Sequence, residues 1–133
     1  MALLGFKPRF VAPIELLIKD QTIRVFRKVP IKQGDHLHLY TGLRTRNCQK
    51  IGEATCLATF TIRIRERSVK IGFGNRQITG LDQLNAFAIR DGFSSWDELV
   101  AFWKEEHGPK CFPFTGTIIY FKLLDKKKWL KPD

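Results

Sequence analysis

The sequence of 133 residues predicts one α+β domain built on a mainly antiparallel, barrel-like sheet. Three observations support this prediction. Short segments in which apolar and polar residues alternate, as in half-buried strands, fill much of the chain. Two segments with helical periodicity follow one another late in the sequence instead of alternating with strands. A hydrophobic fraction of 44%, with 11 Phe and 3 Trp, is enough to fill a core.

The predicted strands are bounded by residues that favour turns. Pro30 cannot continue a strand ladder, and the polar, basic stretch 42–50 is expected to be an exposed loop. A turn is also expected at residues 74–75. The strands are predicted at residues 2–6, 21–28, 36–40, 51–67, 69–73 and 115–124.

Three helical segments are predicted. A short one begins at Pro13, because proline is tolerated at the first position of a helix. A second ends at Gly92, which favours the left-handed conformation of a helix C-terminus. Its apolar stripe consists of Leu81, Leu84, Phe87 and Ala88.

The third helix begins with a capping box and ends near residues 108–109. The Ser95 hydroxyl is expected to accept the backbone N–H of Glu98, while the Glu98 carboxylate reaches back to the cap. Aromatic residues recur at helical spacing in and around these two helices, which predicts that they belong to the core. They are Phe87, Phe93, Trp96, Phe102 and Trp103.

Charge is the strongest signal in the composition. Lys and Arg number 23 against 13 Asp and Glu, which gives a net charge of +10. Such a field attracts polyanions, and nucleic acid is the commonest of them. No apolar stretch approaches the roughly 20 residues that span a bilayer, and no secretory signal is visible. We therefore expect a soluble cytoplasmic protein without a membrane partner, with a domain at residues 1–124 and a basic tail at 125–133.

The histidines and cysteines predict neither a metal nor any other cofactor. Cys48, Cys56 and Cys111 lack the spacing of zinc ligands and are expected to be reduced thiols. His36 and His38 lie two apart, on one face of a predicted strand, and would bind a metal ion only with a third ligand. The prediction for this pair is an ordinary polar strand face.

The order of several short motifs resembles the ASCH family. In that family a strand and a short helix precede the pattern G-x-K-x-x-T-x-R, and here Lys19, Thr22 and Arg24 match it in type and spacing. The glycine is replaced by Leu17, so a side chain is expected where the family leaves the backbone free to be approached. The resemblance runs from about residue 3 to 124 and includes the segments 32–35 and 88–93, Gly42 and the capped helix.

This resemblance implies a small β-barrel of the PUA-like kind, with a cleft between barrel and helices, and RNA or a modified nucleoside as ligand. Some similar proteins are amidohydrolases that remove acyl groups from N(4)-acetylcytidine, and others are described as ribonucleases. In the amidohydrolases the lysine and threonine of the motif act with a later acid. The corresponding residues are Lys19, Thr22 and Asp91, with Glu98 as the second choice of acid.

The chemistry of these residues leaves binding and catalysis open. A threonine hydroxyl attacks an amide only when a base takes its proton, and a lysine whose pKa is lowered by burial can be that base. A carboxylate would orient the lysine, and Arg24 would hold a carbonyl or phosphate oxygen. The same cleft can also bind a ligand without reaction, and a protein-interaction domain is a third alternative.

Arginines form a second candidate surface. Arg63, Arg65 and Arg67 alternate along one face of a predicted strand, where they can follow phosphates. Arg44 and Arg46 in the exposed loop are expected to join them. Tyr40 or Phe73 would stack on a base. The alternative is a solvated outer face. The function that we predict is binding of RNA or a modified nucleoside.

Overall fold

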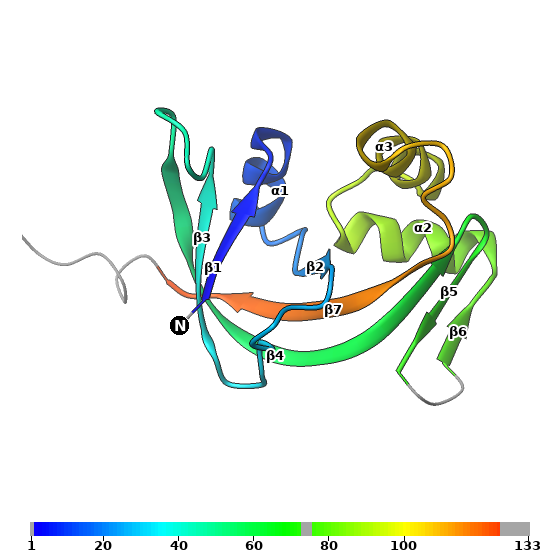
Figure 1. Cartoon of the computed structure of the whole chain (residues 1–133), viewed down its shortest axis with the longest axis horizontal. Helices are drawn as coiled ribbons and strands as arrows, with labels where there is room; N and C mark the ends of the chain where they lie inside the picture. The colour runs from blue at the N-terminus through cyan, green and yellow to red at the C-terminus, as the bar shows by residue number, and fades with distance from the viewer. Residues whose placement is uncertain (1, 73–75, 126–133) are drawn as a thin grey trace, which may run out of the picture.

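The chain folds into one sheet with helices packed on it (Figure 1). The computed structural model describes residues 2–72 and 76–125. The strands are β1 (Ala2–Phe6), β2 (Gln21–Arg24), β3 (His36–Thr41), β4 (Gln49–Arg65), β5 (Ser68–Ile71), β6 (Arg76–Ile78) and β7 (Phe114–Leu123). The helices are the 3-10 helix η1 (Pro8–Phe10) and the α-helices α1 (Val11–Glu15), α2 (Leu81–Arg90) and α3 (Trp96–His107).

The long strands β4 and β7 form the centre of the sheet. They run antiparallel from the Ala54–Leu123 pair to the Ile64–Phe114 pair. On its other side β4 pairs with β3 near one end and with β5 near the other, and β2 pairs with β7. Only β1 and β3 run parallel among the described strands. The α+β class and the mainly antiparallel sheet are therefore confirmed.

The described strands do not close into a barrel. β1, β2 and β6 each pair with a single neighbour, so the sheet keeps open edges. In Figure 1, α1, α2 and α3 all lie on the same side of the curved β4–β7 pair. The sheet thus has one face covered by helices in place of the expected barrel interior.

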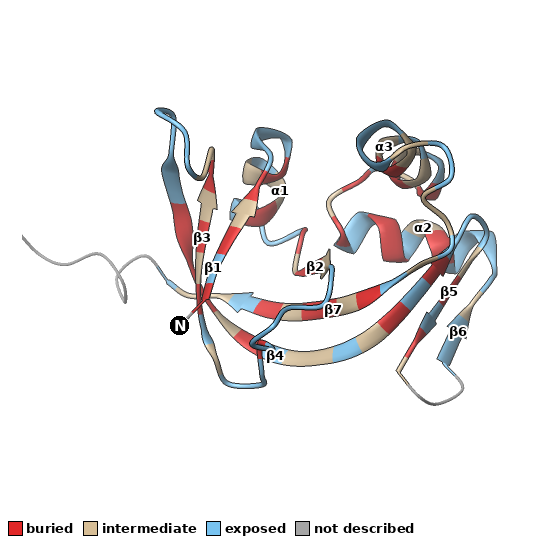
Figure 2. Cartoon of the chain, viewed as in Figure 1, coloured by how far each residue is buried: buried red, intermediate tan, exposed pale blue. Residues whose placement is uncertain are grey.

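The core lies between this covered face and the helices. Along β4 and β7, buried residues recur between exposed or partly exposed ones (Figure 2), as expected for strands with one face on the core. The largest side chains with almost no exposed surface include Leu4, Ile14, Leu37, Ile62, Leu99 and Ile118. Four of the five aromatic residues predicted in the core are buried, and Phe102 is partly exposed.

Two strands differ from their predictions. β2 ends at Arg24 instead of at residue 28, because its pairing with β7 stops there and the exposed side chains of residues 25–29 have no partner strand. β6 was not predicted; it is three residues long and pairs only with β5. Phe73, the predicted turn at residues 74–75, and all of the basic tail after Asp125 lie outside the described residues.

Helix α3 begins as the capping rules predict, but two side chains, Glu98 and Leu81, differ from their predictions. The Ser95 hydroxyl accepts the N–H of Glu98 at 3.1 Å, as predicted. The Glu98 carboxylate, however, accepts the N–H and hydroxyl of Ser94, so the return bond goes one residue earlier. Leu81 was expected in the apolar stripe of α2 but is 65% exposed at the first residue of the helix.

Leu17 forms the C-terminal cap of α1. The N–H of Ile18 bonds to Pro13 and that of Leu17 bonds to Ile14, which is the Schellman pattern, and Leu17 has a φ of 64°. This left-handed position normally takes glycine, the residue found here in the ASCH motif. The Leu17 side chain is 69% exposed, so it points to solvent. Leu17 is not among the residues that line the pocket around Lys19 and Thr22 described below.

None of the α-helices in the described part of the chain is long and apolar enough to cross a membrane.

Two neighbouring leucines test this cap. Leu16 and Leu17 are both 69% exposed, but only Leu17 has a positive φ. Replacing Leu17 with Gly removes the strain of a left-handed backbone at a residue with a side chain, about 1–2 kcal/mol. Gly loses more conformational entropy on folding, at a cost of about 0.5–1 kcal/mol, so Leu17→Gly is expected to be neutral or stabilising. Leu16→Gly has only the cost and is expected to destabilise. Urea unfolding of both variants measures the difference, and equal loss in both would contradict the cap.

Candidate ligand-binding site

Lys19, Thr22, Arg24 and Asp91 line one pocket of about 330 Å³. We call it the Lys19 pocket. Its walls come from β1, η1, β2, the residues after α2, α3 and the start of β7. The structure therefore brings together all three predicted catalytic residues and the predicted ligand-binding Arg24.

The backbone around Lys19 is fixed on two sides. The N–H groups of Ile18 and Lys19 both donate to the Pro13 carbonyl at 2.9 Å, which ties the segment to α1. The N–H of Asp20 donates to the Arg90 carbonyl, and the Asp20 carboxylate binds the Arg90 guanidinium at 3.0 Å. Lys19 therefore enters the pocket from a segment held between α1 and the end of α2.

Gly92 lets Lys19 and Phe10 approach the end of α2. Its φ is 100°, and a Cβ atom there would lie 2.8 Å from Phe10 Cδ1 and 3.0 Å from Lys19 Cδ. Such distances are shorter than carbon contacts allow. The glycine is therefore needed both for the helix end and for the packing of the site.

The Lys19 ammonium is buried among oxygen atoms. Its Nζ donates to the carbonyl of Gln21 at 2.9 Å and to the carbonyl of Asp91, and lies 3.7 Å from Asp91 Oδ1. Burial lowers the pKa of Lys19 from its ordinary value, and the Asp91 carboxylate opposes this shift. Burial likewise raises the pKa of Asp91, and Lys19 and the Gln21 amide oppose this shift. The Gln21 amide donates to Asp91 Oδ1 at 3.3 Å. Each group thus opposes the effect of burial on the pKa of the other.

Thr22 is paired with Arg24, two residues along the same strand face. Arg24 Nε donates to Thr22 Oγ1 at 3.0 Å, and Arg24 Nη2 donates to the Gly5 carbonyl at 2.7 Å. The guanidinium also lies 4.7 Å from the centre of the Phe6 ring. Burial lowers the pKa of Arg24 to about 10. Within the described residues, Lys19 and Thr22 share the pocket but form no hydrogen bond with each other.

Aromatic rings surround these polar groups. Phe10 packs edge-on against Phe93 and Phe102 at centroid distances of 5.4 and 5.6 Å. At the rim, Lys7 and Glu106 form an ion pair of 3.0 Å. The aromatic residues that line the pocket are Phe6, Phe10, Phe93, Phe102, Trp103 and Phe114.

Glu98, the second choice of acid, does not line the Lys19 pocket. Its carboxylate binds the Arg9 guanidinium and the hydroxyl of Ser94. These contacts lower the pKa of Glu98 and keep it charged. Of the two candidate acids, only Asp91 therefore lines the Lys19 pocket.

The predicted arginine surface is separate from the Lys19 pocket. Arg63 and Arg65 are exposed on β4 and line a smaller pocket of about 260 Å³ with Lys70. Arg67 lies in the turn between β4 and β5. None of the other predicted binding residues lines the Lys19 pocket either: Arg44 and Arg46 are exposed after β3, and Tyr40 is half-buried on β3.

A larger hollow of about 590 Å³ shares Arg24 with the Lys19 pocket. It is bordered by Phe26 and Phe60, both largely exposed, and by Arg27 and Arg76. Within residues 2–72 and 76–125, none of the buried polar or charged side chains lines this hollow. The Lys19 pocket is therefore the better candidate, since buried polar groups give a site its specificity.

Sequence reasoning missed Gln21 and most of the pocket walls. Gln21 is 1% exposed and holds both Asp91 and Lys19. In the sequence, Gln21 is a polar residue near Lys19 at the start of a predicted strand. This position does not distinguish a buried amide from an exposed one. The aromatic residues were predicted only as core, and the fold makes some of them both core and wall.

Comparison with known proteins adds no assignment: no family model, curated protein or solved structure matches this chain.

Two equal substitutions test the buried pair. Asp91→Asn leaves the Lys19 charge without a carboxylate and is expected to lower the free energy of unfolding by about 3 kcal/mol or more. Asp20→Asn makes the same change in an exposed pair with Arg90 and is expected to cost less than about 1 kcal/mol.

The pH dependence of Asp91→Asn has a definite sign. Without the carboxylate, the pKa of Lys19 in the folded state falls further below its ordinary value of 10.5. Between these two pKa values the unfolded chain then binds more protons than the folded chain. The free energy of unfolding of Asp91→Asn therefore rises with pH, and its loss relative to the parent becomes smaller. Urea unfolding at a series of pH values measures this. Equal losses for Asp91→Asn and Asp20→Asn would show that the buried pair is not required.

Proposed function

We propose that the chain binds a nucleoside or nucleotide, free or as part of RNA, in the Lys19 pocket. The observation that carries the proposal is a floor of buried polar groups enclosed by aromatic rings. A nucleobase has flat apolar faces and an edge of donors and acceptors. Rings such as Phe102 suit the faces, and the Thr22 hydroxyl and Arg24 guanidinium suit the edge or an attached oxygen.

The size of the pocket favours a small ligand. Its volume of about 330 Å³ lies near the lower end of the range of roughly 300–1,000 Å³ for small-molecule sites. This accommodates one nucleoside rather than a folded nucleic acid. If the ligand belongs to RNA, a single base must leave its stack to enter.

Charge and the sequence resemblance support an RNA-related ligand. The net charge of +10 favours polyanions, and Arg63 and Arg65 with Lys70 form an exposed basic cluster on the sheet. Membership of the ASCH family and a PUA-like arrangement of the sheet are part of this proposal. They rest on Lys19, Thr22 and Arg24 in sequence and on the glycine-like φ of Leu17.

Phenylalanine substitutions test the binding pocket. Phe102→Ala removes a wall of the Lys19 pocket and is expected to weaken binding of N(4)-acetylcytidine or cytidine by about 1–3 kcal/mol, the contribution of one base-stacking ring. Phe60→Ala removes an exposed ring from the neighbouring hollow and is the matched control. Because Trp103 lines the Lys19 pocket, quenching of its fluorescence reports binding.

A second control separates the pocket from the basic surface. Replacing Arg63, Arg65 and Arg67 together with Gln is expected to leave nucleoside binding unchanged, since none of the three lines the pocket. For an RNA oligonucleotide the same variant is expected to bind with a flatter dependence on salt, because fewer counterions are released. No quenching by any nucleoside or RNA, or equal binding by Phe102→Ala and Phe60→Ala, would refute the proposed site.

An amidohydrolase is the second candidate. The observation in its favour is that burial lowers the pKa of Lys19 beside Asp91, in the pocket that also holds Thr22. In this reaction the Thr22 oxygen adds to the acyl carbon while its proton passes to neutral Lys19. The C–N bond then breaks, the amine leaves with that proton, and water hydrolyses the acyl-threonine ester.

The hydrogen bonds of the structure favour binding over this reaction. The Lys19 ammonium donates to the carbonyls of Gln21 and Asp91, and the Thr22 hydroxyl accepts from Arg24. Catalysis needs Lys19 to lose a proton and contact Thr22 instead. A ligand that displaces Arg24 from Thr22 would permit this contact.

Cytidine release from N(4)-acetylcytidine tests the reaction. Thr22→Ala is expected to abolish turnover while the ligand still binds, and Thr22→Ser to retain part of the rate because a hydroxyl remains. Lys19→Arg is expected to be inactive, since a guanidinium does not deprotonate at any usable pH. If the parent protein quenches with ligand but releases no cytidine, or if Thr22→Ala matches it, the catalytic proposal fails and the binding proposal stands.

A further inference from the structure

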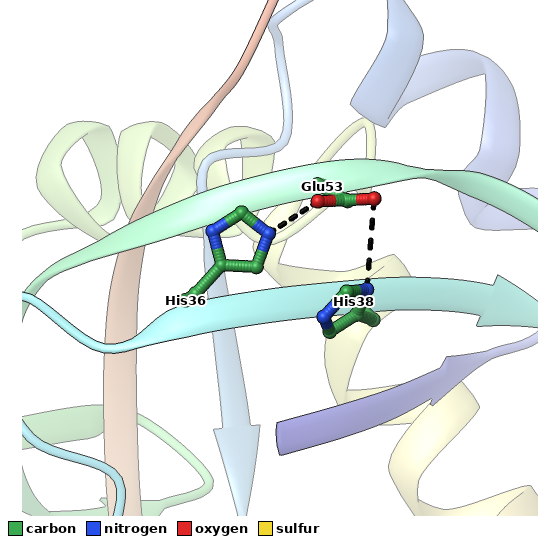
Figure 3. A group of neighbouring side chains, drawn as sticks. All are labelled: His36, His38 and Glu53. Carbon is green, nitrogen blue, oxygen red and sulfur yellow. Dashed lines mark hydrogen bonds and ion pairs between the residues drawn. The ribbon is translucent and has the colours of Figure 1, made fainter. Parts of the chain in front are cut away.

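A second group of chemically active side chains lies on the strand pair β3–β4 (Figure 3). His36 and His38 occupy alternate positions of β3, and Leu37 and Leu39 between and beside them are fully buried. The histidines therefore point away from the side on which the leucines enter the core. Glu53 on β4 is the direct cross-strand partner of His38, so its side chain shares their face.

The three side chains meet at their polar ends. In Figure 3 both histidine rings turn toward the Glu53 carboxylate. His36 Nε2 is hydrogen-bonded to Glu53 Oε1, and His38 Nδ1 lies 3.7 Å from Glu53 Oε2. One nitrogen from each histidine and one Glu53 oxygen all lie within 4.8 Å of one another. The sequence alone indicated the two histidines, and β-sheet register supplies the third ligand.

We propose that His36, His38 and Glu53 bind a divalent transition-metal ion such as Zn²⁺. Imidazole nitrogen and carboxylate oxygen are preferred ligands of this class of metal. Zn²⁺ with bonds of about 2.0–2.2 Å needs donor atoms about 3.3 Å apart, so modest side-chain rotations convert the observed cluster into a site.

Burial supports a site with one open side. The side chains of Glu53 and His38 are only 11% and 16% exposed, and that of His36 is 44% exposed. Glu53 and His38 are therefore largely enclosed, and the cluster opens to solvent at His36. Three protein ligands leave at least one coordination position for water or a small ligand on the exposed side.

Lys50 is the residue with which a metal ion must compete. The register of β3 and β4 shifts at Ile51, between the Leu39–Gly52 and Tyr40–Lys50 pairs. This bulge places the Lys50 ammonium on Glu53 Oε2, although residues three apart in a regular strand face opposite sides. A bound divalent ion would take over the neutralisation of Glu53 that Lys50 provides. Removing this ammonium is therefore expected to strengthen metal binding.

The metal site is distinct from the Lys19 pocket. His36, His38 and Glu53 are absent from its lining, so the inference does not rest on the proposed function. The competing explanation is a polar cluster in which Lys50 and the histidines serve only as hydrogen-bond and ion-pair partners of the buried Glu53 carboxylate. The two explanations differ in whether an added metal ion binds.

The test is a titration of the full chain, free of any affinity tag, with Zn²⁺ and Co²⁺. Calorimetry is expected to show one ion per chain, and Co²⁺ is expected to give the visible absorption of a low-coordinate nitrogen–oxygen site without a thiolate band. Glu53→Gln and His38→Ala each remove a ligand and are expected to weaken binding by about tenfold or more, at least as much as the loss of a group that only hydrogen-bonds a metal ligand.

Three further variants make the result specific. His107→Ala removes a histidine remote from the cluster and is expected to bind like the parent, while Lys50→Met is expected to bind more tightly. Cys48→Ser, which removes the exposed thiol, is expected to have no effect. Circular dichroism of the metal-free variants checks that each is folded. Zn²⁺ is expected to raise the thermal stability of the parent but not that of Glu53→Gln.

The proposal is overturned if the parent binds neither ion. It is overturned equally if folded Glu53→Gln and His38→Ala bind like the parent, or if a thiolate band and loss of binding in Cys48→Ser place the metal on a cysteine.

Discussion

The candidate site depends on the burial of one lysine charge. Lys19 is separated from Asp91 by 72 residues in sequence, yet its ammonium binds both the carbonyl and the carboxylate side of that residue. A buried ammonium without such partners would be driven to lose its proton or its burial. The contact therefore requires the segment after α1, the start of β2 and the end of α2 to be in place together.

That constraint also explains the small residue and the unusual backbone around the site. Gly92 must lack a side chain because Phe10 and Lys19 occupy the space, and Leu17 accepts a left-handed φ so that the chain can turn from α1 into the buried segment. At Leu17 the local conformational preference yields to the turn that the chain must make, whereas Gly92 adopts a φ that glycine favours. Strain of this kind persists only where the surroundings enforce it.

The two faces of the sheet carry different side chains. On β3 and β4 every second residue enters the core, which leaves His36, His38 and Glu53 together on the other side. Farther along β4 the same alternation buries Ile62 and Ile64 and exposes Arg63 and Arg65. The Lys19 pocket, by contrast, is formed where β2 meets the helices. Three groups of polar and charged side chains thus share one small sheet without sharing one site.

The sequence by itself determined the α+β class, the helix capped by Ser95 and most strand positions, because local periodicity and capping depend on neighbouring residues. Lys19, Thr22 and Arg24 were predicted from the family resemblance, and their meeting with Asp91 in one pocket depends on the tertiary structure. Tertiary structure decided the open sheet, the end of β2, the unexpected β6 and the role of Gln21, since each depends on which strand or helix lies alongside. It also brought Glu53 to the two histidines and separated the arginines from the pocket. Such contacts follow from strand register between distant segments, which no local pattern specifies.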